Sequence, residues 1–201
     1  MNKYSLYLLF FSFSSLAANI APSEKSYVSI EIGYTMGEHL LQAQGMTGKV
    51  EWDPTTSEIK SGELKMAIAN IKSQKSELEC HMRESLGLDY LISNFPKDHV
   101  CNDEDKLPSA GPNSIKYPEI SATLLSVLKM GENEAKVQWV IHGEKFTITM
   151  PITVTKGNEG EVLRMNSKWN MKLSDFDIIV KKFLFIGVKD DVKLKLDAFF
   201  Q

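Results

Sequence analysis

The sequence predicts an all-β protein built on an antiparallel sheet. Apolar and polar residues alternate along most of the chain, as they do in strands with one buried and one solvated face. Turn-forming residues separate these runs at intervals that suit hairpins rather than the long crossovers of a parallel sheet. A stretch after Ile71 instead carries apolar residues at helical spacing. Together these observations favour strands joined by short turns, with one helix inserted among them.

The first alternating run begins at Tyr27, where Val28, Ile30, Ile32 and Tyr34 share one face and polar or small residues occupy the other. One face of this strand is therefore expected to be wet. The same pattern returns in five later groups of residues: Leu64, Met66 and Ile68; Val137, Trp139 and Ile141; Phe146, Ile148, Met150, Ile152 and Val154; Leu163, Met165, Trp169, Met171 and Leu173; Val192, Leu194 and Leu196.

The helix is marked by Leu78, Met82 and Leu86, which recur at intervals of four residues. A Pro, Gly and Asn-rich stretch from Leu107 to Pro118 predicts an irregular loop. Shorter turn signals separate the strands at Asp53-Pro54, Gly131 to Asn133, Gly143, Gly157 to Gly160, and Lys189 to Asp191.

About eight antiparallel strands with one apolar face must pack as a two-sheet sandwich or close into a barrel, and closure removes the exposed edges. A barrel of this size is either filled by its own side chains or holds one small ligand. Methionine and tryptophan are abundant on the inner faces, which suits an adaptable pocket and a solid core equally well. Periodicity alone leaves that choice open.

The N-terminus resembles a secretory signal peptide. Lys3 precedes an apolar run from Leu6 to Phe13, and small residues lead to an expected cleavage site after Ala17. The run is too short and too rich in serine to cross a membrane as a helix. We therefore expect residues 1–17 to be a signal peptide, residues 18–201 to form one domain, and the mature protein to be periplasmic or secreted.

Cys80 and Cys101 are the two cysteines of the chain. In an oxidising compartment such a pair is expected to form a disulfide. It would close a loop of roughly 20 residues, which the chain-entropy model values at about 3 kcal/mol. Because neither cysteine directly follows the apolar run, no lipid anchor is expected, and the mature protein should carry no stable membrane anchor.

The charges exclude one class of partner. The 23 basic and 26 acidic side chains nearly balance, and neither sign forms a long block. The positive field that nucleic-acid binding requires is therefore missing.

Several segments, read in order, resemble the YceI-like family of polyisoprenoid-binding proteins, whose fold is similar to the lipocalin barrel. They span nearly the whole mature chain, and their order and spacing carry the resemblance more than any one of them does. The segments are Gly48 to Asp53; Ala69 to Ser73 leading into Cys80 to Glu84; Lys116-Tyr117-Pro118-Glu119-Ile120; Ile141-His142-Gly143 with Thr147 to Val154; and Ser174-Asp175-Phe176.

The chain also departs from the family pattern. Ala122 stands where the family usually has Phe, Leu173 where it has Arg, and Asp177 where it has Gly; Glu84 replaces an Asp. The resemblance places these positions at the pocket and its rim, so the ligand could differ within the same barrel. The segment from Cys80 to Cys101 looks like an insertion of a subgroup.

The resemblance implies an exported carrier that holds a long-chain isoprenoid or other lipid inside a lipocalin-like antiparallel β-barrel, with the helix covering one end. It implies neither an enzyme nor a cofactor. The inner faces supply the candidate ligand-binding residues Ile30, Ile32, Met66, Ile68, Val137, Trp139, Ile148, Met150, Met165, Trp169, Leu194 and Leu196. Arg83 is added as a cation that could fix a polar ligand head, although an ion pair with Glu79 or Glu84 is the simpler role.

Other sites in the sequence are weaker. Cys80, His81 and Met82 are adjacent on a helix, so their side chains point in different directions and do not converge on a metal. No catalytic serine motif occurs, and His142 before Gly143 is expected to hydrogen-bond backbone or solvent. The stretch from Glu77 to Tyr90 is thus interpreted as a structural clamp, with Arg83 and Tyr90 near the barrel mouth.

Two further functions stay open. The barrel could be filled and act as an envelope interaction or stress-related module without a small ligand. It could also be a hydrolase or isomerase for a lipid-like substrate that depends on His142. The sequence does not decide whether the protein forms a homodimer.

Overall fold

The computed structural model describes residues 17–35, 37–74, 76–88, 115–178 and 187–201. Its strands are β1 (Ala18–Ile20), β2 (Tyr27–Tyr34), β3 (Gly37–Gln44), β4 (Thr47–Asp53), β5 (Glu58–Ala67), β6 (Ile71–Lys72), β7 (Glu119–Leu124), β8 (Leu128–Lys129), β9 (Gly131–Ile141), β10 (Glu144–Lys156), β11 (Leu163–Lys172) and β12 (Val188–Phe200). The helices are α1 (Ser76–Gly87) and two short 3-10 helices, η1 (Ile68–Asn70) and η2 (Leu173–Phe176).

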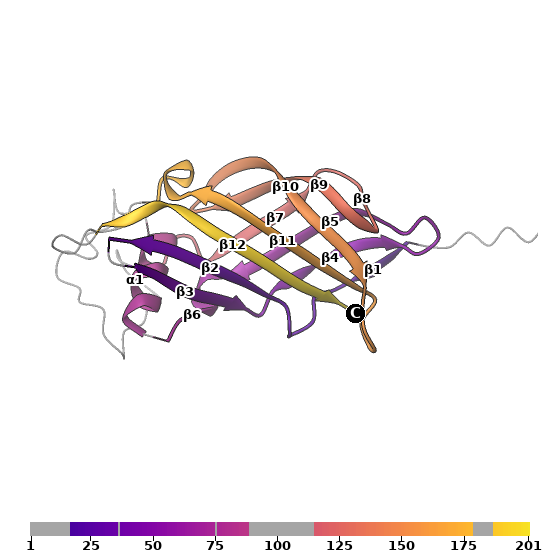
Figure 1. Ribbon diagram of the computed structural model, residues 1–201, viewed down its shortest axis with the longest axis horizontal. Coiled ribbons are helices and arrows are strands. Elements are labelled where there is room, and N and C mark those ends of the chain that lie inside the picture. The colour runs from indigo at the N-terminus through magenta and orange to yellow at the C-terminus, as the bar shows by residue number, and fades with distance from the viewer. Residues whose placement is uncertain (1–16, 36, 75, 89–114, 179–186) are drawn as a thin grey trace, which may run out of the picture.

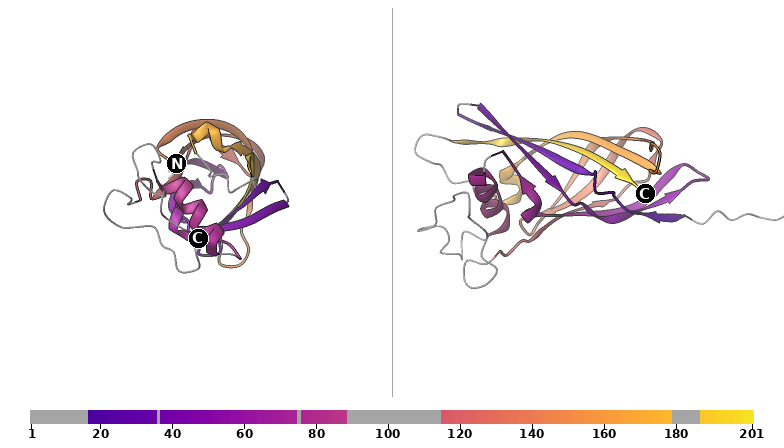
Figure 2. Two further views of the ribbon diagram at one scale, coloured as in Figure 1. Left: turned by 90° about the vertical axis from the view of Figure 1, so that its left-hand side faces the viewer. Right: turned by 90° about the horizontal axis from the view of Figure 1, so that it is seen from below.

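All the strands belong to one antiparallel sheet in the order β1-β4-β5-β7-β9-β10-β11-β12-β2-β3-β6, with β8 beside β5. The sheet curls around a common axis, and Figure 2 shows it along that axis and from the side. Its two ends meet because β3 pairs with β6, while β4 and β5, their neighbours along the chain, pair with each other. The predicted antiparallel barrel is confirmed.

About eight strands were expected, but the described residues form twelve separate strands, β1 to β12. Two long strands of the barrel are each interrupted: Gly45-Met46 separates β3 from β4, and η1 separates β5 from β6. The short strands β1 and β8 supply the rest of the excess. Both interruptions also shift the alternation by one residue: buried residues change from Leu41 and Ala43 to Met46 and Val50 across the first, and from Met66 to Ile71 across the second.

The N-terminal segment links β4 to the end of β12. Residues 18–20 pair with β4, and then Ala21 exchanges two backbone hydrogen bonds with Gln201 at the end of β12. Ser23 N–H also donates to Phe199 O at 2.6 Å. These bonds close the barrel wall where β12 extends beyond β2.

The inner faces follow the predicted alternation. In β10, Met150, Ile152 and Val154 are buried, while the residues between them are more exposed. The same phase occurs in β11, where Leu163, Met165 and Trp169 are buried. The apolar core is thus the interior of the barrel, and the outer face meets solvent.

Helix α1 lies across one end of the barrel (Figures 1 and 2). Met82 and Leu86 are buried because they are four residues apart and share the face that turns toward the barrel. The helix predicted from their spacing is confirmed. At its end, a Cβ on Gly87 would come within 2.3 Å of Ile68 Cδ1, so glycine lets the helix approach η1 closely.

The segment after residue 114 ties this helical cap to the sheet. The carbonyl of Gly87 accepts hydrogen bonds from the backbone N–H groups of Lys116 at 2.6 Å and Tyr117 at 2.9 Å. Ile68 N–H donates to Pro118 O at 3.0 Å. Residues 115–118 are irregular, as predicted for this part of the loop, and 107–114 lie outside the described residues.

Two predicted turns are wrong. Residues 131–133 begin β9 and pair with Val154, Thr153 and Ile152 of β10. Residues 189–191 lie inside β12, where the pairing with β2 moves from Val188 opposite Tyr34 to Val192 opposite Ile32. Three residues therefore face the single residue Gly33, which is a bulge rather than a turn. Bulges and turns share the same small and polar residues, so composition did not distinguish them.

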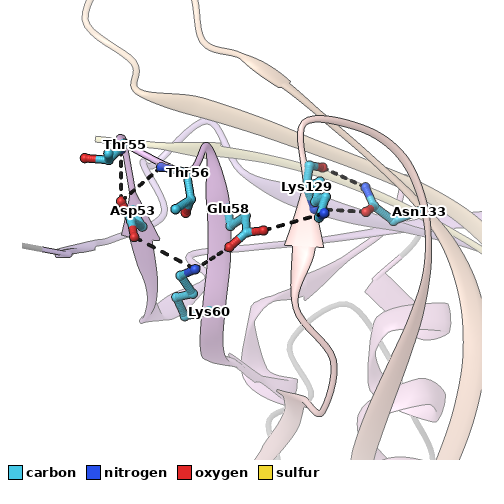
Figure 3. A network of polar contacts seen from close by, with 7 residues as sticks. All are labelled: Asp53, Thr55, Thr56, Glu58, Lys60, Lys129 and Asn133. Atoms are coloured by element: carbon cyan, nitrogen blue, oxygen red, sulfur yellow. Dashed lines mark hydrogen bonds and ion pairs between the residues drawn. The ribbon is translucent and has the colours of Figure 1, made fainter.

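Polar side chains fasten the end of the barrel opposite α1 (Figure 3). Asp53 ends β4, and hydrogen bonds from the backbone N–H groups of Thr56 and then Thr55 lower the pKa of its carboxyl. Lys60 bonds Glu58, which lowers the pKa of Glu58 and raises that of Lys60. Glu58 also lies 3.8 Å from Lys129 Nζ. The network joins the β4–β5 hairpin to β8.

Candidate ligand-binding cavity

An apolar cavity of about 140 Å³ runs through the barrel interior. Ten of the candidate residues line it: Ile30, Ile32, Met66, Val137, Trp139, Met150, Met165, Trp169, Leu194 and Leu196. The wall also includes Met82 and Leu86, so the cavity reaches the underside of α1. Lys65 is the one charged residue in the described lining, and its Nζ lies 3.4 Å from Glu63.

Three candidates are not part of this lining. Ile68 is buried in η1, where the chain leaves the sheet and packs beneath the end of α1. Ile148 is half-buried against the core, four positions before Ile152 on β10. The interruption at η1 moves Ile68 out of the alternating row, which the sequence pattern did not reveal.

Arg83 faces away from the cavity. Its Nε donates to the backbone carbonyl of Glu79 at 3.1 Å, and its Nη2 donates to a carboxylate oxygen of Glu79 at 3.1 Å. Because Met82 and Leu86 occupy the inner face of α1, the helical period directs Arg83 toward Glu79, one turn earlier. The ion pair considered from the sequence is the one found, and the placement of Arg83 at the cavity is wrong.

Several lining residues had not been named as ligand-binding candidates. Some of them belong to alternating rows already recognised in the sequence, such as Leu64, Ile152, Met171 and Val192. Naming every residue of those rows would have included them. Five more come from turns and helices: Met46, Met82, Leu86, Leu173 and Ile178. The remaining ones lie on strands. Period-two alternation carries no information about residues that reach the interior from outside strands.

The lining is adaptable as well as apolar. Six of the nine methionines of the chain contribute to it: Met46, Met66, Met82, Met150, Met165 and Met171. Methionine has three rotatable bonds and a polarisable thioether, so such a wall adjusts to different occupants. For scale, an engineered cavity of about 150 Å³ holds one benzene molecule. The empty cavity thus suits a group about the size of one isoprene unit, and a longer chain requires side-chain movement.

Two indoles form the largest aromatic surface of the lining. Trp139 on β9 and Trp169 on β11 stack with ring centroids 5.3 Å apart and an interplanar angle of 27°. Trp139 Nε1 is buried, and no acceptor among the described residues bonds it. Ala122 lies directly opposite Trp139 in the β7–β9 pairing.

His142 joins the cap to the barrel. Its Nε2 lies 2.5 Å from Leu88 O, just after α1, and its Nδ1 lies 3.3 Å from Phe176 O in η2. Its ring also contacts Tyr117 at a centroid distance of 4.5 Å. Both ring nitrogens face backbone carbonyls, as the sequence suggested, so the geometry gives His142 a positioning role.

The bulge in β12 supports the same end. Asp190 accepts a hydrogen bond from Ser174 N–H at 2.8 Å and another from Ser174 Oγ at 2.7 Å. These bonds lower the pKa of the Asp190 carboxyl. The aspartate is therefore used to hold η2 against β12.

The cysteine and metal predictions are only partly covered by the described residues. Cys80 is buried in α1, and the described residues include no free cysteine. Cys101 and Tyr90 lie outside the described residues, so the disulfide and the placement of Tyr90 stay predictions. Within the described ranges, no group of three His, Cys, Asp or Glu side chains is arranged to hold a metal ion.

The fold and cavity together define a class: an antiparallel, lipocalin-like β-barrel with an apolar interior, capped at one end by a helix. The model of the YceI-like domain matches residues 20–200. The chain therefore belongs to the YceI-like family, as the sequence motifs suggested. In the described parts of the chain, no helix is both long and apolar enough to span a bilayer.

Solved structures have the same fold. A polyisoprenoid binding domain from Saccharophagus degradans, implicated in plant cell wall breakdown, superposes with a TM-score of 0.64 at 12% identity, covering 92% of this chain and 98% of its own. BcnA of Burkholderia cenocepacia gives 0.60 at 15% identity, covering 87% and 96%. The YceI protein of Campylobacter jejuni gives 0.52 at 16% identity, covering 99% and 97%. No curated protein sequence matches the chain.

Proposed function

We propose that this protein binds a long-chain isoprenoid or a related lipid inside its barrel. The observation that carries the proposal is the continuous apolar cavity beneath α1, whose described lining has no charged residue except Lys65. A similar structure is a polyisoprenoid binding domain, which supports the same class of ligand.

Burial of the apolar chain supplies the affinity. Removing apolar surface from water contributes about 25 cal/mol per Å², so several hundred Å² of isoprenoid surface contribute on the order of 10 kcal/mol before the costs of association. Part of that energy is used to move methionine side chains, because the empty cavity is only about 140 Å³.

Binding rather than catalysis is proposed because of the chemistry of the wall. The described lining contains no Asp, Glu, His, Cys or Ser, so a general acid, general base or nucleophile would have to be Lys65. His142, the histidine considered for catalysis, faces two backbone carbonyls instead.

We also propose that the protein is exported and acts in the periplasm or outside the cell. The apolar run from Leu6 to Phe13 and the small residues before Ala18 support this. The first strand, β1, starts at Ala18, immediately after the expected cleavage site. Recovery of the mature chain from the periplasm or medium with Ala18 at its N-terminus would agree; retention in the cytoplasm with residues 1–17 intact would refute export.

Native mass spectrometry of the protein purified from its own compartment tests the ligand. The expected result is an added mass that is released on denaturation and proves to be an isoprenoid or another long-chain lipid. A bare polypeptide that also fails to take up such lipids from vesicles would contradict the proposal. That outcome would favour a filled barrel acting as an interaction module, a function for which the small volume of the empty cavity is the supporting observation.

A further inference from the structure

The two stacked indoles lie near the capped end of the cavity. Trp139 is two residues before Ile141, the last residue of β9, and the next residue, His142, contacts the chain that follows α1. The Trp139–Trp169 pair, with Met82 and Leu86 of α1, thus forms one end of the apolar lining. A ligand that enters the barrel far enough to reach the cap must contact these rings.

The indole N–H of Trp139 is a buried donor without an acceptor in the described part of the protein. A buried polar group without a partner costs about 1 to 3 kcal/mol. Native structures contain few such groups, and each calls for an explanation such as a functional role. Phenylalanine would fill most of the same space without that cost, so the N–H is a reason to expect an acceptor in the bound state.

The other described residues of the cavity wall offer little to accept this hydrogen bond. Ala122, directly opposite Trp139 on β7, also lines the cavity and presents only a methyl group. Met150 and Met165 belong to the same lining and offer only weak thioether acceptors. A lipid longer than the empty cavity must displace adjustable lining side chains to enter, and it must do so to reach the buried N–H.

We propose that the ligand carries a neutral hydrogen-bond acceptor, such as a carbonyl, ester or ether oxygen, that receives the Trp139 N–H inside the barrel. This inference rests on the proposed lipid-binding function and narrows its ligand class. A charged head group does not fit there, because burying an anion without a cation is far more costly than burying a carbonyl. Lys65, the charged lining residue, is partly exposed and already paired with Glu63.

The test compares two probes on three proteins. The probes are geranylacetone, an isoprenoid ketone, and its hydrocarbon analogue with a methylene in place of the carbonyl. The proteins, stripped of lipid, are the wild type, Trp139→Phe and Trp169→Phe. Trp139→Phe should bind the ketone about three- to tenfold more weakly while its affinity for the hydrocarbon changes less than about twofold. Trp169→Phe is the matched control and should change both affinities by the same factor.

A spectroscopic measurement on the wild type avoids any dependence on variant folding. The chain has three tryptophans, so it has three indole N–H signals in a nitrogen–proton correlation spectrum. Geranylacetone should move the Trp139 signal downfield, as a new hydrogen bond does, and the hydrocarbon should not. Selective labelling of tryptophan, with Trp52→Phe and Trp169→Phe spectra, assigns that signal by elimination.

The outcomes separate the two proposals. If both probes bind the wild type but Trp139→Phe weakens them equally, or the Trp139 signal responds equally to both, the acceptor inference is wrong and lipid binding stands. If neither probe binds the wild type, lipid binding in this cavity is refuted, and the acceptor inference is refuted with it.

Discussion

Replacing Ala122 by leucine asks whether the barrel interior is a cavity or a close-packed core. Ala122 lines the cavity, and leucine adds three carbons that point into it. An engineered cavity of similar size accepts the six carbons of benzene, so three carbons fit into about 140 Å³. Ala122→Leu should therefore fill empty space rather than displace its neighbours.

The expected effect follows from the area that the new side chain buries. Each buried methylene contributes about 0.8 kcal/mol, so three contribute about 2.4 kcal/mol. Ordering a leucine side chain costs about 0.5 to 1 kcal/mol. The free energy of unfolding should therefore rise by about 1.5 kcal/mol, which for a domain of this size raises Tm by about 3 to 6 °C.

Ala135→Leu is the matched control. Ala135 lies on the same face of β9 as Val137 and is completely buried, but it does not line the cavity. The same three added carbons there must displace packed neighbours, which costs about 1 to 3 kcal/mol. The two substitutions should thus have opposite signs.

Urea unfolding of lipid-free protein, followed by tryptophan fluorescence, measures both effects. Uptake of geranylacetone should fall in Ala122→Leu, because the leucine occupies ligand space. Equal destabilisation by Ala122→Leu and Ala135→Leu would show that the interior is packed throughout. In that case the reasoning from the cavity fails.

Three further predictions concern the contacts around the barrel. His142→Phe keeps a ring against the cap but removes the imidazole contacts to Leu88 O and Phe176 O. It should lower the free energy of unfolding by about 1 to 3 kcal/mol and speed amide exchange in α1, and unchanged exchange would refute the tethering role. Arg164→Leu removes two hydrogen bonds, of 2.8 and 2.6 Å, to the buried carboxylate of Asp197. It should lower the free energy of unfolding in urea by about 2 to 4 kcal/mol. Adding Asp197→Leu should recover part of that loss, because no unpaired charge then stays buried. Ser174 donates two hydrogen bonds to Asp190, which holds the pKa of the Asp190 carboxyl below its ordinary value of 3.8 in the folded state. The stabilisation is therefore present above that value and is lost as the pH falls through the lower folded pKa. Asp190→Asn should flatten this acid limb of the plot of unfolding free energy against pH, and an unchanged limb would contradict the assignment.

Most of the motifs that carried the family resemblance meet at the cap, whereas Gly48 to Asp53 lies in β4, which ends at the opposite end of the barrel. Tyr117 contacts His142, His142 bonds the carbonyl of Phe176, and a Cβ on Gly143 would lie 2.6 Å from the Tyr117 ring. Gly143 has a φ of +81°, which glycine adopts without strain. These segments therefore build the frame that holds α1 in place. Most of the cavity is lined by other residues, which explains why the motifs identify the family and not the ligand.

Two of the departures from the family pattern line the cavity. Ala122 and Leu173 both line the cavity, so the chain has a methyl group and an apolar side chain where the family usually has Phe and Arg. Asp177 has a φ of +51° immediately after η2, a conformation that the family pattern serves with glycine and that aspartate tolerates better than most residues. Two of these three changes alter the shape or polarity of the ligand space directly.

By itself the sequence determined the all-β class, the single helix, the family, and ten lining residues, because alternation with a period of two is a local property of each strand. Only the tertiary structure decided that strands are interrupted at Gly45-Met46 and η1, that residues 189–191 form a bulge, and that Ile68 does not line the cavity. It also decided that no acceptor among the described residues bonds the Trp139 N–H. Such features depend on which residues meet across the barrel, and contacts between distant segments leave no periodic trace in the chain.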